Sequence, residues 1–124
     1  MFRFADHGYN VPEDGLYTTK AYYETHKREM DAFAEASRKG WEWVHKHPKE
    51  ALDIVMEEIE KAQGYASRVL QKKGLEVILD AQIDRQQQKV TYALTKETFD
   101  QVLQILKRAD LIKGDINYQT FVKP

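Results

Sequence analysis

The chain has 124 residues, of which 42% are hydrophobic and 31% charged, and its 19 basic side chains nearly cancel its 20 acidic ones. This composition fits one folded domain and argues against disorder, and the balanced charge gives no basis for nucleic acid or an anionic membrane as a partner. The absence of cysteine excludes disulfides, thiolate nucleophiles, iron–sulfur clusters and cysteine-ligated zinc.

Residues 1–19 are predicted to form a strand, a turn and a second strand. Phe2 and Phe4 alternate with polar neighbours, as on one face of a strand. The segment 11–15 has proline and glycine at positions that favour a turn. The segment 16–19 is rich in β-branched and aromatic residues, which favour a strand.

Helices are predicted for most of the remaining chain, so the fold class is mainly α, or α+β with a minor sheet. Apolar residues recur at helical spacing, and Gly40 is expected to interrupt the first helix. A polar run between apolar flanks in 82–94 favours a loose hairpin or an extended loop, and the apolar tail 116–122 is expected to dock on the body. The predicted helices are Lys20–Lys46, Pro48–Ala62, Ser67–Asp80 and Thr95–Ala109.

Two helix starts have clear local signals. Pro48 is favoured in the first turn of a helix, and the residue before it avoids the α region. Thr95 is a good N-cap, and Leu94 and Phe99 occupy the two positions of a hydrophobic staple. The apolar residues expected to face inward are Met30, Phe33, Ala34, Ser37, Trp41 and Val44, then Leu52, Val55, Met56 and Ile59, then Leu70, Leu75, Ile78 and Leu79, and finally Phe99, Val102, Leu103 and Leu106.

Several segments, taken in order, resemble one branch of the ABC-transporter substrate-binding proteins. This branch serves nitrate, sulfonates, taurine and thiamine-pyrimidine precursors, and includes thiamine-pyrimidine-synthase-like members. The segments are ADHGYNVPEDGLYTT (5–19), MDAFAEA (30–36) with GWEWV (40–44), HPKEALD (47–53), and LTKETFD (94–100) with the tail 114–122. Each motif is weak alone, and their order carries the resemblance.

The resemblance implies a protein of two α/β lobes that holds its ligand in the cleft between them and delivers it to a membrane permease. Residues 1–124 would form a single partial domain of one lobe, with the strand-turn-strand 1–19 followed by the four-helix C-terminal segment 20–124. The implied role is a non-catalytic solute-binding component, or a fragment of one, in an ABC-type importer. Its ligand would be a small polar or anionic metabolite such as a sulfonate, nitrate or a thiamine pyrimidine precursor.

The resemblance also bears on catalysis and location. Eukaryotic relatives that make the thiamine pyrimidine depend on a cysteine-rich motif, so this cysteine-free chain is expected to be no enzyme and to need no cofactor. The family implies a periplasmic or extracytoplasmic location. However, the first ten residues lack a basic segment followed by an apolar one, so we expect no signal peptide in this chain. If the chain is the whole gene product, the expected location is therefore the cytoplasm.

The length of the chain leaves its origin open, since two complete lobes need more than 124 residues. Three origins are consistent with this length: a truncated protein, a short gene descended from a binding protein, and a proteolysed remnant.

A second interpretation is a stand-alone helical oligomerisation or regulatory module. Without a partner lobe such a chain exposes apolar surface, which favours a homo-oligomer.

The best candidate ligand-binding residues lie in the irregular N-terminal segment. His7, Tyr9, Asn10 and Asp14 supply polar and aromatic groups there, and binding residues often lie on such segments. The alternative is a purely structural turn, which the isolated chain favours because a pocket needs convergent walls.

A metal site is not expected. His45 and His47 form an H-x-H pair, but they lie at a predicted helix end, where they point in different directions. No third histidine or cysteine completes a ligand set nearby. Their expected role is favourable charge at the C-terminus of a helix.

Overall fold

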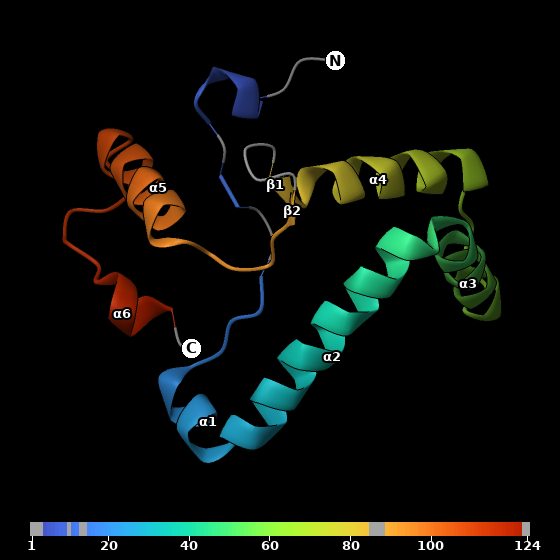
Figure 1. Ribbon diagram of the computed structural model, residues 1–124, viewed down its shortest axis with the longest axis horizontal. Coiled ribbons are helices and arrows are strands. Elements are labelled where there is room, and N and C mark those ends of the chain that lie inside the picture. The colour runs from blue at the N-terminus through green and yellow to red at the C-terminus, as the bar shows by residue number, and fades with distance from the viewer. Residues whose placement is uncertain (1–3, 10, 13–14, 85–88, 123–124) are drawn as a thin grey trace. The chain divides into compact units, whose positions relative to one another are not determined.

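The computed structural model describes residues 4–9, 11–12, 15–84 and 89–122, and these are mainly helical (Figure 1). Backbone contacts divide the chain into a central unit, residues 18–92, and a terminal unit, residues 1–17 with 93–124. The elements in chain order are the 3₁₀ helix Phe4–His7, α1 (Lys20–Thr25), α2 (Lys27–Lys46), α3 (Pro48–Lys61), α4 (Arg68–Ala81), β1 (Ile83–Asp84), β2 (Lys89–Val90), α5 (Lys96–Arg108) and α6 (Tyr118–Phe121).

The helix predicted for 20–46 is two helices, because the chain breaks at His26, whose φ of −126° is not helical. Side chains next to the break bond to the backbone of α1. The Thr25 hydroxyl donates to the carbonyls of Ala21 and Tyr22, each at 3.1 Å. The His26 ring lies 2.8 Å from the same hydroxyl and stacks on the Tyr22 ring. Such local bonds compete with the helical ladder, and sequence periodicity does not detect them.

The predicted interruption at Gly40 is wrong, since α2 runs unbroken from Lys27 to Lys46. A Cβ placed at Gly40 would meet no atom within 4 Å. This glycine therefore lowers the intrinsic helix propensity of an exposed position without breaking the helix.

The start of α3 at Pro48 is confirmed, and α2 and α3 meet at a corner there (Figure 1). Gln63 ends this helix in the left-handed region with a φ of 55°. The Gly64 N–H then donates to the Ile59 carbonyl at 2.8 Å, which closes a Schellman motif. A Cβ at Gly64 would lie 3.1 Å from the Ile59 side chain, so a larger residue there would require Ile59 to shift by a few tenths of an ångström.

Residues 82–94 contain the predicted hairpin in minimal form. β1 and β2 pair antiparallel, with Ile83 opposite Val90. The Thr91 N–H continues the pairing by donating to the Gln82 carbonyl at 3.0 Å. This two-residue pairing is the only strand structure within the described ranges, and the fold is therefore mainly helical.

The predicted N-terminal strands are wrong where they can be compared. Phe4 lies in a 3₁₀ helix, and 16–19 has no regular structure, while Phe2 lies outside the described residues. Gly8 accounts for the 3₁₀ helix, because its φ of 85° places it at the left-handed C-terminal position of a Schellman motif. The Tyr9 N–H completes that motif by donating to the Phe4 carbonyl at 3.1 Å.

In the terminal unit, α5 begins as predicted. The Thr95 hydroxyl accepts the Thr98 N–H at 3.2 Å. The tail docks as expected, because the Phe99 ring contacts those of Tyr118 and Phe121, with centroids 5.5 and 5.4 Å away. The Tyr118 hydroxyl also donates to the Leu94 carbonyl at 2.8 Å.

Few of the residues predicted to face inward are buried. Among the described residues, the buried apolar side chains are Ala51, Leu52 and Phe99. The expectation was wrong for Phe33, Ala34, Val55, Leu70 and Ile78, which are exposed. Helical periodicity marks an apolar face but not whether the unit supplies anything to cover it. Within the described ranges, no helix combines the length and apolar character needed to cross a membrane.

Candidate ligand-binding site

Two of the predicted site residues lie in an open depression of the terminal unit. It has a volume of about 490 Å³, and its walls come from the end of the 3₁₀ helix with the two residues after it, and from the end of α5. The lining residues are His7, Gly8, Tyr9, Ile105, Arg108 and Ala109. All of them except Ile105 are exposed, so the depression is one wall rather than an enclosed cavity.

The N-terminal wall is fixed by backbone bonds rather than by burial. The Gln101 side-chain amide donates to the Gly8 carbonyl at 3.0 Å, which ties this wall to α5. The Schellman bond from Tyr9 to Phe4 holds the turn closed. Together these two bonds set Tyr9 at the edge of the depression. Only glycine adopts the backbone conformation of position 8 without strain.

Arg108 is the charged group of the depression. Its neighbour Lys107 pairs with Asp115, and that hydrogen bond holds the pKa of the Asp115 carboxyl below its ordinary value. Among the described residues, Arg108 has no carboxylate partner. A guanidinium presents several N–H donors in a planar fork that suits sulfonate, phosphate or carboxylate oxygens. The depression can therefore hold a small anion beside an aromatic ring.

The structure brings together only part of the predicted site. His7 and Tyr9 line the depression, whereas Asn10 and Asp14 lie outside the described residues. Sequence reasoning missed Ile105 and Arg108. Arg108 is a basic residue in the last turn of α5, where the negative end of the helix dipole accounts for a cation without any ligand. The sequence does not show that the last turn of this helix lies near His7, so it gave no reason to include Arg108 in the site.

The H-x-H pair does not converge on one point. His45 Nε2 lies 2.9 Å from the Gln82 side-chain oxygen. His47 instead stacks on the Trp43 ring, with centroids 4.9 Å apart, and its Nδ1 lies 3.9 Å from a Glu50 oxygen. The two rings therefore point to different partners, as predicted. Within the described residues, no three histidine, aspartate or glutamate side chains form a set that could hold a metal.

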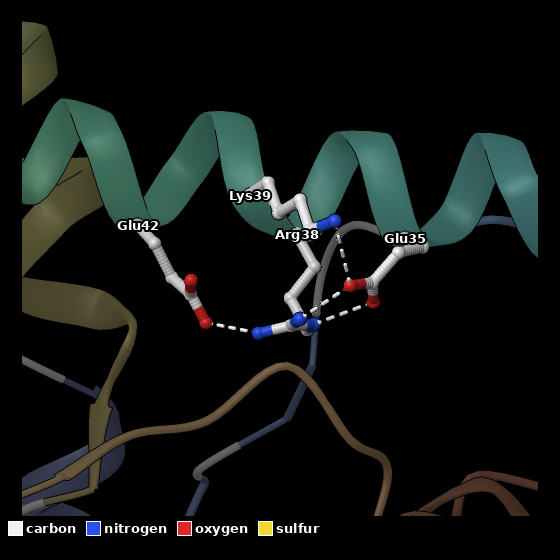
Figure 2. Close-up of polar contacts among 4 residues, drawn as sticks. All are labelled: Glu35, Arg38, Lys39 and Glu42. Carbon is white, nitrogen blue, oxygen red and sulfur yellow. Dashed lines mark hydrogen bonds and ion pairs between the residues drawn. The ribbon is translucent and has the colours of Figure 1, made fainter.

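A second charged cluster lies along α2 (Figure 2). Arg38 donates to both Glu35 oxygens, at 2.7 and 2.9 Å, and also pairs with Glu42, while Lys39 lies 3.4 Å from Glu35. The hydrogen bond from Arg38 lowers the pKa of the Glu35 carboxyl. Burial raises the pKa of the Tyr92 hydroxyl, and the negative charge of Glu42 raises it further. The charges satisfy one another, so this cluster stabilises a helix face and offers little to a ligand.

The corner between α3 and α4 forms another open depression, of about 390 Å³. Its one arginine, Arg68, is paired with Asp53, and Glu57 and Glu60 add further negative charge. Among the described lining residues, the acidic side chains outnumber this one cation, which disfavours an anion. The depression at His7 and Arg108 is therefore the better candidate for a small anionic ligand.

Comparison with protein families matched the N-terminal part of the chain. Residues 1–51 match the NMT1/THI5-like family model. This family comprises ABC-transporter substrate-binding proteins and thiamine-pyrimidine synthases. The match confirms the resemblance over residues 1–51, which include His7, Tyr9 and all of α2. Comparisons with curated proteins and with solved structures found no match.

Proposed function

We propose that this chain is a non-catalytic solute-binding component, or a fragment of one, of an ABC-type importer. The observation that carries the proposal is the family match over residues 1–51. In this role residues 1–124 are a partial domain of one lobe of a periplasmic-binding-protein-like α/β fold. The protein works outside the cytoplasm, and its partner is a membrane permease. The absence of cysteine supports binding rather than synthesis, because the synthases of this family depend on a cysteine-rich motif.

The ligand of the proposed component is a small polar or anionic metabolite such as a sulfonate, nitrate or a thiamine pyrimidine precursor. The depression supports this choice through the Arg108 guanidinium and the Tyr9 ring. In a two-lobed relative, this wall would face a second wall across the cleft, and closure of the lobes would enclose the ligand. One open wall gives weak binding, because most of a tightly held ligand's surface is buried.

Calorimetric titration of the chain with taurine tests this proposal. We expect binding in the millimolar range, with heats that depend on Arg108. Arg108→Gln removes the charge-assisted hydrogen bonds to the sulfonate and is expected to weaken binding about tenfold. Nitrate is expected to follow the same pattern. A neutral aminopyrimidine is expected to be insensitive to the substitution.

Arg28→Gln is the matched control, because it removes the same charge from the exposed surface of α2. We expect it to leave taurine binding unchanged. Equal losses in the two variants would indicate nonspecific attraction and contradict the proposed site. So would an absence of heat with all three compounds, or micromolar binding that Arg108→Gln does not alter.

A second candidate function is a helical oligomerisation module descended from such a protein. The observation that favours it is the apolar surface that the central unit leaves exposed, on Phe33, Trp43, Ile54, Val55, Val69, Leu70, Val77 and Ile78 among others. Apolar surface of this extent usually marks an interaction site. In this role the chain is a homo-oligomer.

A further inference from the structure

The helix α4 is apolar on two opposite sides. Its half-buried side, with Leu75 and Leu79, packs within the central unit. At about 100° per residue, Leu70 and Val77 lie roughly 160–180° away from that side. The apolar side chains outside it are Val69, Leu70, Val77 and Ile78, which are 77%, 71%, 42% and 46% exposed. An ordinary surface helix carries polar residues there.

The exposed side contains a regular stripe, which we call the α4 stripe and define as Leu70, Gly74, Val77 and Ala81. These residues recur at i, i+4, i+7 and i+11, the spacing of a helix-pairing seam. Large and small side chains alternate along it. A Cβ placed at Gly74 would meet no atom within 4 Å, so none of the described residues occupies the space above this position.

Charge along α4 is divided between its two halves. Arg68, Lys72 and Lys73 lie in the first half, and Glu76 and Asp80 lie in the second. Lys73 and Glu76 approach to 3.3 Å, but their side chains are 72% and 51% exposed. Such an exposed pair contributes little stability and does not prevent either group from meeting an outside charge.

We propose that α4 pairs antiparallel with α4 of a second copy of this chain through the α4 stripe. This inference rests on the second candidate function above and assigns a surface to it. With the two-fold axis between positions 75 and 76, Leu70 meets Ala81 of the second copy and Gly74 meets its Val77. Each large side chain thus faces a small one. The basic half of each helix lies beside the acidic half of the other.

A parallel pair lacks both kinds of complementarity. It would place Leu70 against Leu70 and Gly74 against Gly74, which leaves a gap between the helices. It would also place like charges side by side. Because α4 has 14 residues and is only about 21 Å long, the paired area is small. We therefore expect a weak, concentration-dependent dimer rather than an obligate one.

Analytical ultracentrifugation over a wide concentration range measures this association. We expect the unmodified chain to shift from monomer to dimer, and Val77→Lys to raise the dimer dissociation constant at least about tenfold, because it places an unpaired charge in the seam. Tyr65→Lys adds the same charge at a 99% exposed position outside α4 and is expected to leave the constant unchanged. Equal circular dichroism of all three proteins establishes that the variants fold.

Engineered cysteines test the antiparallel register, since the natural chain has none. Under mild oxidation, the double variant Leu70→Cys with Ala81→Cys is expected to form a cross-linked dimer. Leu70→Cys alone is expected not to, because the two 70 positions then lie about 16 Å apart along the seam. A parallel pair would give the opposite result for the single variant.

The possible results distinguish the antiparallel α4 pairing from the oligomeric role on which it rests. A strictly monomeric chain at every concentration would overturn both the oligomeric role and the α4 pairing, and would indicate that something other than a second copy covers this side. A dimer that Val77→Lys does not weaken, or that Leu70→Cys alone cross-links, would leave the oligomeric role standing and overturn the antiparallel α4 pairing.

Discussion

Replacing Phe99 with alanine is expected to destabilise the terminal unit by about 3–5 kcal/mol, the usual cost of removing a buried aromatic ring. Phe99 is 7% exposed and is the one buried apolar residue among those described in this unit. Its ring joins α5 to α6 through the Tyr118 and Phe121 rings. Without it, both ring contacts between α5 and α6 are lost, so α6 is expected to detach.

The loss is measured by urea unfolding followed through the amide NMR signals of α5 and α6. Tyr17→Ala is the control within the same unit, because Tyr17 is 91% exposed, and a change of less than about 0.5 kcal/mol is expected there. A Phe99→Ala protein that loses less than about 1 kcal/mol would show that this residue is not the centre of the terminal core.

Leu52→Ala is expected to destabilise the central unit by about 2–5 kcal/mol. Leu52 is 5% exposed and lies on α3, the helix that contacts both α2 and α4. A cavity at this position weakens both helix contacts at once, because the surrounding side chains relax only partly into the space.

Tryptophan fluorescence during urea unfolding isolates this effect, since both tryptophans of the chain, Trp41 and Trp43, lie on α2 in the central unit. The matched control is Ile54→Ala on the same helix, because Ile54 is 51% exposed and fills no core position. We expect the control to cost much less than Leu52→Ala. Equal losses from the two substitutions would contradict the packing described for α3.

Much of the helical structure follows from local sequence signals. A helix start leaves its first backbone N–H groups unpaired. The Thr95 hydroxyl accepts one of them, and Pro48 has no N–H to leave unpaired, so both residues mark helix starts. These starts are where the structure has them. The break at His26 and the 3₁₀ turn before Gly8 were missed. Side-chain hydrogen bonds accompany the break at His26, and the left-handed conformation of Gly8 ends the 3₁₀ turn. Neither feature produces a periodic pattern in the sequence.

Only the N-terminal wall of the candidate site was predictable from the sequence. His7 and Tyr9 stand out because they flank a glycine in an irregular segment, whereas Arg108 joins them only through the fold of the terminal unit. Burial was the least predictable property, because α4 is apolar on two sides, and Leu70 lies on the side away from Leu75. Their different exposure depends on what the rest of the unit places over each side of α4.

The most direct test of the central claim, that the wall formed by His7, Tyr9 and Arg108 binds a small anion, is a two-dimensional NMR titration with taurine. We expect the amide shifts to be confined to residues 7–9 and 105–109, and to saturate in the millimolar range. Arg108→Gln should remove them. Shifts centred instead on the α3–α4 corner, or no shifts at saturating taurine, would contradict the account.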